Sequence, residues 1–215
     1  MLLDHKTAIV YGAGGAIGSA VARAYAREGA EVHLAGRTQA TLEEVAQRIR
    51  RDGGNAQVAQ VDVLDRAAVA QHADVVAAGR HMTRRGRGVI LVMAGGREAI
   101  PRLGGSHVAW AALAGLCRQL AAEFGPHGVR VSWLLSPGSP GYDEHDQRRH
   151  GAGPGEAEDA MAAGQTEAAP STTGLLAGHL PSYDEVANIA VFAASDWART
   201  ITASEINFTG GAVVD

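Results

Sequence analysis

The sequence has one cysteine and no apolar run long enough to cross a membrane. Cys117 cannot form a disulfide within the chain, and its place on the apolar stripe of a predicted helix indicates a small core residue. No segment approaches the ~18 apolar residues of a membrane span. The opening MLLDHKTAIVYG also lacks the charged and apolar regions of a secretion signal. We therefore expect a cytoplasmic protein without a membrane partner.

An excess of basic charge is also absent. The formal net charge is -4 and the sequence pI is about 6.1, so the chain has no global positive field that would attract nucleic acid. The basic cluster RHMTRRGRG is too short to change that conclusion. With 215 residues, of which 46% are hydrophobic and 20% charged, the composition is that of a single globular domain, residues 1–215.

The first half of the chain alternates between strand and helix patterns. Short apolar runs predict strands at Thr7–Tyr11, Glu31–Ala35 and Ala56–Val61. The Ala-rich segment Ser19–Glu28 predicts one helix between them. TQATLEEVAQRIRRDGG predicts a second, with an early acidic turn and with Gly53 at its end. This alternation predicts an α/β fold with a parallel sheet covered on both faces.

The second half continues the alternation. The expected elements are a buried strand in GVILVMAGG, a helix over Ser106–Phe124, a strand in VRVSWLLSPG, a helix in YDEVANIAVFAASDW and a last strand in SEINFTGGAVVD. The helix that starts near Tyr183 has its N-cap around Ser182 or Asp184.

Two stretches interrupt this pattern. In the first, only 25 residues, Leu64–Gly88, separate the third strand from the next. That length accommodates one crossover but not two helices with a strand between them. We predict one long helix from Asp65 to about Arg85, because the alternative, a strand in ADVVAAG, leaves too few residues to cross back.

The second interruption, residues 139–180, is rich in Gly, Ala, Pro and Glu and shows little periodicity. It follows the carboxyl end of a strand, where open parallel sheets bind ligands, so we expect a lid or flexible loop. Within it, Tyr142 is a candidate proton donor to a carbonyl, although a solvated charged loop is the alternative. Its His and acidic residues follow no strict ligand pattern, so we expect no metal site.

Glycine is abundant, at 28 of 215 residues, and YGAGGAIG concentrates it between a predicted strand and helix. There, backbone N–H groups and the positive helix N-terminus can bind a phosphate. The spacing fits Gly-x-x-x-Gly-x-Gly, with Ala16 in the middle place, rather than Gly-x-Gly-x-x-Gly. A purely structural glycine turn is the alternative. The cofactor-binding residues expected here are Gly12, Gly14, Gly15, Ile17 and Gly18.

Arg37 follows the second predicted strand, in AGRTQ. An acidic residue at this place binds the ribose 2'-hydroxyl of NAD, whereas an arginine favours the 2'-phosphate of NADP. Arg37 therefore predicts NADP(H) rather than NAD(H) as the cofactor. An ordinary surface arginine is the alternative.

These motifs resemble, in their order along the chain, those of the short-chain dehydrogenase/reductase family, classical type. YGAGGAIG corresponds to the family's Thr-Gly-x-x-x-Gly-x-Gly turn and VRVSWLLSPG to its strand ending in Pro-Gly, while EVANIAVFAASDWARTITASEINFTGG resembles its closing helix and strand. The resemblance implies a single Rossmann-like, doubly wound parallel sheet, a small-molecule substrate and a homo-oligomer. It adds Asp62, Val63 and Pro137 to the cofactor-binding residues.

The resemblance also implies hydride transfer between a nicotinamide and a carbonyl or alcohol carbon. In the family a Tyr passes the proton, and a Lys four residues later lowers its pKa and holds the nicotinamide ribose. WAALAGL aligns with the family's Lys-Ala-Ala-Leu-x-Gly-Leu and puts Ser106 at the Tyr and Trp110 at the Lys. A Ser hydroxyl is a weaker and shorter acid than a phenol, and an indole carries no positive charge. Ser106 is kept as a candidate catalytic residue, with a helix cap as the alternative.

The family's other two catalytic roles are vacant as well. Its substrate-orienting Ser aligns with Ala94 or Gly95, and its Asn falls in the shortened stretch, where the remnant VVAAG has no Asn. The shortening implies that the central strand and a helix are missing or recast, so we expect a sheet with fewer strands than is usual in the family.

We therefore expect an NADP(H)-binding homologue of carbonyl and alcohol oxidoreductases that lacks the usual catalytic Asn-Ser-Tyr-Lys set. Two alternatives stay open. One is a catalytically inactive cofactor-binding or partner protein. The other is a non-redox cyclase, dehydratase or isomerase that uses the pocket beside residues 139–180.

Overall fold

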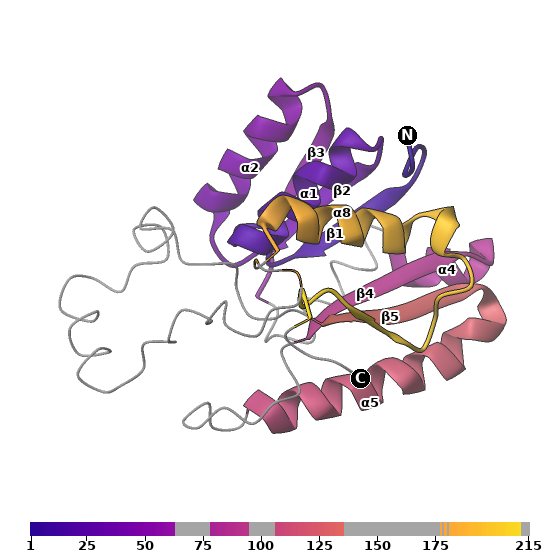
Figure 1. Ribbon diagram of the computed structural model, residues 1–215. Helices are drawn as coiled ribbons and strands as arrows, with labels where there is room; N and C mark the ends of the chain where they lie inside the picture. The colour runs from indigo at the N-terminus through magenta and orange to yellow at the C-terminus, as the bar shows by residue number, and fades with distance from the viewer. Residues whose placement is uncertain (63–77, 95–105, 136–176, 178, 180, 212–215) are drawn as a thin grey trace.

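The computed structural model describes residues 1–62, 78–94, 106–135, 177, 179 and 181–211 (Figure 1). Its strands are β1 (Thr7–Tyr11), β2 (Glu31–Gly36), β3 (Asn55–Gln60), β4 (Gly88–Ala94), β5 (Val129–Leu135) and β6 (Glu205–Asn207). Its α-helices are α1 (Ala16–Arg27), α2 (Gln39–Arg51), α4 (Ala78–Arg85), α5 (Ser106–Phe124) and α8 (Tyr183–Ala194). Two short 3-10 helices, η1 (Gly125–His127) and η2 (Asp196–Ala198), follow α5 and α8.

The described strands form two three-stranded sheets in which all neighbours are parallel. Sheet A has the order β1-β2-β3 and sheet B the order β4-β5-β6. Within the described residues no ladder of hydrogen bonds joins β1 to β4. The predicted α/β class with parallel strands is confirmed, and the described residues form six strands.

Helices cover the strands on both faces (Figure 1). On one face, α1, α2 and α8 share a single apolar core with β1, β2, β3 and Leu134 of β5. On the other, α5 packs on β4 and β5 through Cys117, Val131 and Trp133. Cys117 is fully buried there, as predicted, and burial raises the pKa of its thiol. Since side chains alternate along a strand, β5 contributes to both cores.

Sheets A and B are held together through their shared helical layer. Helix α8 packs along α1 and also contacts β4. The Tyr25 hydroxyl of α1 donates a hydrogen bond of 3.4 Å to the Ala190 carbonyl of α8, and both residues are buried. This layer therefore links the two sheets independently of any strand pairing between β1 and β4.

Some helix ends lie where they were predicted, and others do not. Helix α5 has the predicted bounds, and α8 begins after Ser182, whose side chain accepts from the Glu185 N–H while the Glu185 carboxylate accepts from the Ser182 N–H. Helix α1 begins at Ala16 rather than at Ser19. The predicted early acidic turn of α2 is wrong, because the helix begins at Gln39 and its first turn has no acidic residue.

The two interrupted stretches fall mainly outside the described residues. Of the helix predicted from Asp65 to Arg85, the part that is described, α4, is helical and ends at Arg85. The alternative strand in ADVVAAG fails at its end, because Ala78 and Gly79 belong to α4. The predicted lid, residues 139–180, lies outside the residues that the structure describes, except for Ala177 and His179. Among the described residues, no helix combines the length and apolarity required to span a membrane.

Candidate functional site

The glycine turn lies at the carboxyl end of β1 and leads directly into α1. Gly12 has a φ of +72°, a left-handed conformation that favours glycine. The Gly15 N–H donates to the Gly12 carbonyl at 3.0 Å, which closes the turn. The Ala13 N–H donates to the Ala35 carbonyl at 3.2 Å, which ties the turn to β2. The turn is therefore fixed from within and from the neighbouring strand.

Gly14 and Gly18 are required by close packing. A Cβ on Gly18 would overlap the carbonyl oxygen of Gly12, since the first turn of α1 lies directly against the glycine turn. A Cβ on Gly14 would lie 2.5 Å from Oγ1 of Thr41 in α2. At Gly12, by contrast, a Cβ would meet open space. The glycine turn is thus tightly packed at Gly14 and Gly18, whereas the space beside Gly12 is open.

The N-terminus of α1 suits an anion. Its N-cap is Gly15, which offers no side-chain cap, and no acidic residue stands in its first turn. Backbone N–H groups at such an end carry partial positive charge and can donate to a phosphate. The turn and helix end therefore form a cradle that fits the pyrophosphate of a dinucleotide.

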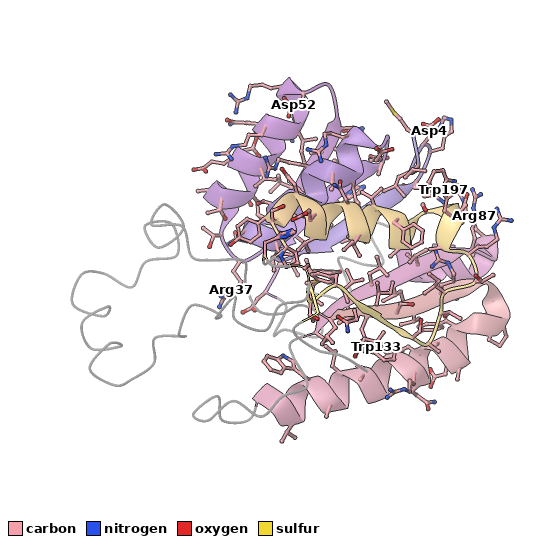
Figure 2. All side chains as sticks on the ribbon, in the orientation of Figure 1. Asp4, Arg37, Asp52, Arg87, Trp133 and Trp197 are labelled. Carbon is pink, nitrogen blue, oxygen red and sulfur yellow. The ribbon has the colours of Figure 1, made fainter. Side chains whose placement is uncertain are left out.

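Arg37 stands at the carboxyl end of β2, on the same edge of sheet A as the glycine turn (Figure 2). Gln60, the last residue of β3, donates from Nε2 to the Arg37 carbonyl at 2.8 Å. The side chain of Arg37 is exposed, and it makes no ion pair or hydrogen bond with any described residue. The contact with Gln60 thus fixes the backbone of Arg37, and its guanidinium is exposed at this edge of the sheet. Asp62 is exposed just beyond β3.

At the carboxyl edge of sheet B, two strands end in apolar residues and the third ends in an asparagine. Ala94 ends β4 and Leu135 ends β5, and both are buried. Asn207 ends β6, and its Oδ1 accepts from the N–H of Thr209 at 3.0 Å and from Oγ1 of Thr209 at 2.8 Å. An Asn whose side chain accepts from the backbone two residues later is a turn signal that can be recognised in a sequence.

The remaining predicted site residues are not brought together by the described structure. Ser106 is the first residue of α5, and Trp110 lies one turn later and is half-buried. Val63, Pro137 and Tyr142 lie outside the described residues. Among the residues that the structure does describe, no group of three or more His, Cys, Asp or Glu side chains could hold a metal ion.

Comparison with known families identifies the chain. A family model described as short chain dehydrogenase matches residues 6–80, and one described as enoyl-(acyl carrier protein) reductase matches residues 71–213. The chain belongs to the short-chain dehydrogenase/reductase family. The resemblance inferred from the glycine turn and the C-terminal motifs is thereby confirmed, and with it membership of an oxidoreductase family.

The relatives of this short-chain dehydrogenase/reductase homologue include reductases and dehydrogenases. The short-chain reductase protein NovJ of Streptomyces niveus is 31% identical, over 97% of this chain and 94% of its own. D-threitol dehydrogenase of Mycolicibacterium smegmatis is 28% identical, over 97% and 93%.

Solved structures agree on the fold. A Beutenbergia cavernae protein assigned as an NAD(P)-dependent gluconate 5-dehydrogenase, with NADP bound at low occupancy, is 27% identical. The similarity covers 97% of both chains with a TM-score of 0.78. An NAD⁺-bound xylitol dehydrogenase has a TM-score of 0.81 at 19% identity, over 98% of this chain and all of that one, and supports the fold alone.

Proposed function

We propose that this family member binds NADP(H) through its glycine turn and Arg37, and that it does not use the family's Tyr and Lys for proton transfer. The observation that carries the proposal is the exposed Arg37 guanidinium, which no described residue pairs, beside a glycine turn that is closed to side chains at Gly18. A positive group at the end of the second strand matches a ribose 2'-phosphate.

Different residues of the chain would bind different parts of the cofactor. The backbone N–H groups of the turn and of the α1 N-terminus would hold the pyrophosphate. Arg37 would hold the 2'-phosphate, with its backbone fixed by Gln60. Asp62, by family resemblance, would lie beside the adenine. A similar structure at 27% identity contains NADP at low occupancy, and the preference for NADP(H) over NAD(H) in this chain depends on Arg37.

The nicotinamide, when bound, supplies a hydride for a carbonyl carbon. Reduction also needs a proton donor at the carbonyl oxygen. Ser106 and Trp110 stand on α5 where the family's Tyr and Lys align, and neither side chain can replace them chemically. The alignment with NovJ extends over 259 positions, more than the 215 residues of this chain, which supports an internal shortening. Any reduction would therefore need another donor, for which Tyr142 is the sequence candidate.

A catalytically inactive cofactor-binding protein is the second candidate function. The buried apolar ends of β4 and β5, Ala94 and Leu135, favour it, because they offer no side-chain donor to a substrate oxygen. Oxidation of NADPH with a broad panel of carbonyl compounds separates the two candidates. Turnover with any of them supports the reductase, and binding of NADPH without turnover supports the inactive protein.

Calorimetric titration of the purified chain tests the binding of NADP(H), which both candidate functions share. NADPH should bind with measurable heat, and at least about tenfold more tightly than NADH, since one charge-assisted phosphate contact is worth about 1.5–3 kcal/mol. Absence of binding by both nucleotides, or equal affinity for them, would overturn it.

A further inference from the structure

We infer that the edge of the molecule opposite the glycine turn binds an acidic segment of a partner protein, in which carboxylates flank an apolar side chain. The surface that would receive this segment, which we call the Trp197 patch, consists of Trp197, Phe192, Lys6, Arg87 and Arg199. Lys6 immediately precedes β1, whereas the glycine turn follows the carboxyl end of that strand. A partner on the Trp197 patch would therefore leave the glycine turn accessible.

The basic side chains of the patch surround the exposed carboxylate of Asp196. Lys6 donates from Nζ to Oδ1 of Asp196 at 3.0 Å. The hydrogen bond and the charge of Lys6 lower the pKa of the Asp196 carboxyl, and the charges of Arg199 and Arg87 add to this effect. Arg87 is exposed just before β4, and its side chain makes no hydrogen bond or ion pair with any described residue. These four residues together have an excess of positive charge, in a chain whose formal net charge is -4.

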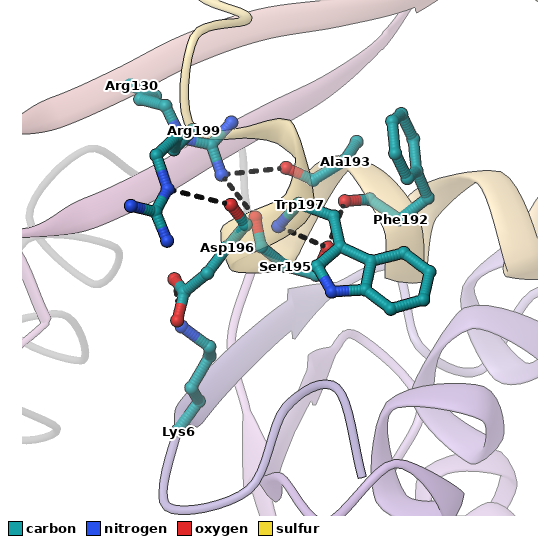
Figure 3. Close-up of polar contacts among 8 residues, drawn as sticks. All are labelled: Lys6, Arg130, Phe192, Ala193, Ser195, Asp196, Trp197 and Arg199. Atoms are coloured by element: carbon teal, nitrogen blue, oxygen red, sulfur yellow. Dashed lines mark hydrogen bonds and ion pairs between the residues drawn. The ribbon is translucent and has the colours of Figure 1, made fainter.

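Two aromatic rings are exposed beside these charges. Trp197 of η2 is 75% exposed and Phe192 of α8 is 39% exposed. Ser195 joins their backbones, since its Oγ donates to the Phe192 carbonyl at 2.7 Å and accepts from the Trp197 N–H at 3.2 Å (Figure 3). Figure 2 shows Trp197 and Arg87 at the same end of the molecule. Trp and Arg are enriched among the residues that dominate the binding energy of protein interfaces.

The backbone beneath the patch is already fixed in the free chain. Ser195 is fully buried, and Arg130 donates to its carbonyl at 3.0 Å. The turn at Gly86, which leads into Arg87, packs against Gly128, where a Cβ would overlap the Gly86 carbonyl oxygen. Binding to a surface that is fixed in this way costs little conformational entropy.

The charge pattern favours an acidic protein segment over a phosphate-rich surface. The side chain of Asp196 is 74% exposed among the basic groups, and that of Asp4 is 58% exposed near Lys6 in the sequence. Nucleic acids and anionic membranes present continuous negative charge, which both carboxylates would repel. A protein segment can instead place its carboxylates at Arg87 and Arg199 and an apolar side chain at Trp197, because its charges are discrete.

NMR titration of the full chain tests the inference with a synthetic peptide that has glutamates on both sides of a central phenylalanine. The chain has three tryptophans, so it gives few indole N–H signals, and Trp197→Phe identifies the signal of Trp197. We expect this signal to shift until it saturates, while that of Trp133, which is 2% exposed, stays in place. A Trp197 signal that does not move at any peptide concentration would overturn the inference.

A second peptide separates recognition from charge attraction. With serine in place of the central phenylalanine, the peptide should bind at least about tenfold more weakly, because it loses its contact with the indole. Equal affinity of the two peptides would show attraction by charge alone and would contradict the inference.

Charge reversal tests the basic part of the patch. Arg87→Glu should weaken the phenylalanine peptide by at least about tenfold. Arg51→Glu is the matched control, since Arg51 is an exposed arginine beside Asp52, which Figure 2 shows at a distance from Trp197. It should leave the affinity within about threefold of the wild type. An equal loss in both variants would assign the binding to net charge and overturn the inference.

Other occupants of the patch give different results in the same NMR measurement. Vesicles of phosphatidylserine and phosphatidylcholine, or a DNA duplex, that shift the Trp197 signal at lower concentration than the peptide does would assign the patch to a membrane or to nucleic acid. A Trp197 signal that moves with protein concentration alone would assign it to a second copy of the chain. Each of these outcomes would contradict an acidic partner protein.

Discussion

The α-carbon of Gly18 faces the carbonyl oxygen of Gly12 with no room between them for a methyl group. Gly18 lies inside α1, where glycine weakens a helix, so its presence is explained by this contact and not by helix propensity. The pair fixes how closely the N-terminus of α1 approaches the turn, and hence where the phosphate-binding N–H groups point.

Gly18→Ala should therefore displace the turn. We expect a loss of about 1–3 kcal/mol in the free energy of unfolding, because the added methyl meets backbone that cannot rotate away. NADPH affinity should fall by at least about tenfold. Urea unfolding and calorimetry measure the two effects.

Gly115→Ala is the matched control for that exchange. Gly115 lies in α5, and a Cβ there would meet no atom within 4 Å. This variant should gain up to about 1 kcal/mol from helix propensity and keep its NADPH affinity. If Gly18→Ala behaves like Gly115→Ala, the contact with Gly12 does not constrain the turn.

Arg37→Ala should change cofactor choice and leave stability unchanged. The side chain is exposed and unpaired among the described residues, so its removal costs little stability. NADPH affinity should fall by about tenfold or more while NADH affinity stays the same, because NADH has no 2'-phosphate. Titration of both nucleotides, with Arg84→Ala as control, gives the result. A parallel loss for NADH would assign Arg37 a general electrostatic role.

Arg130 supports the C-terminal end of α8 (Figure 3). Its guanidinium donates to the carbonyls of Ala193 at 2.9 Å, Ser195 at 3.0 Å and Ile201 at 3.1 Å. Burial lowers the pKa of this arginine, and the charge of Asp196 opposes that shift. Arg130→Met should destabilise the fold by about 2–4 kcal/mol, since these carbonyls lose a charged donor.

Arg199→Met is its control, because Arg199 makes one exposed hydrogen bond to the described part of the chain, from Nε to the Asp196 carbonyl. It should cost no more than about 0.5 kcal/mol. If urea unfolding shows a similar loss in the free energy of unfolding for both variants, the Arg130 contacts do not stabilise the fold more than the exposed contact of Arg199 does.

Glu185 should make the stability of the fold depend on pH through the N-terminal cap of α8. Hydrogen bonds from the Ser182 N–H and hydroxyl, and then from His179, lower the pKa of its carboxyl. A lowered folded-state pKa adds stability above the pKa of the unfolded chain, and that stability is lost as the pH falls through the folded value. The wild type should thus lose more stability on acidification below the ordinary value of 4.5 than Glu185→Gln does.

Urea unfolding at neutral and acidic pH measures this difference. Glu123→Gln, on the surface of α5, controls for the loss of one negative charge. An identical acid response of the wild type and Glu185→Gln would refute the role of the cap.

Local patterns in the sequence predicted much of the fold. The strands β1 to β5, the bounds of α5 and the cap at Ser182 follow from hydrophobic periodicity and residue type within a few positions. The start of α1 did not, because Gly18 is a poor helix former that the contact with Gly12 holds in place. The first turn of α2 was misjudged because its start at Gln39 puts Glu43 and Glu44 in the second turn.

The site was predicted only in part. The glycine turn and Arg37 are contiguous motifs that can be read from the chain. The hydrogen bond from Gln60 to Arg37 depends on the register in which Gly36 pairs with Gln60, and no local pattern specifies that register. The link between the two sheets through Tyr25 and Ala190 is likewise a long-range contact.

Amide hydrogen exchange with and without NADPH tests most directly the claim that the turn and the end of β2 bind the cofactor. The account predicts that saturating NADPH slows exchange in residues 12–18 and 36–41, where the phosphates would be held. Bound NADPH that leaves exchange in these two segments unchanged would contradict it.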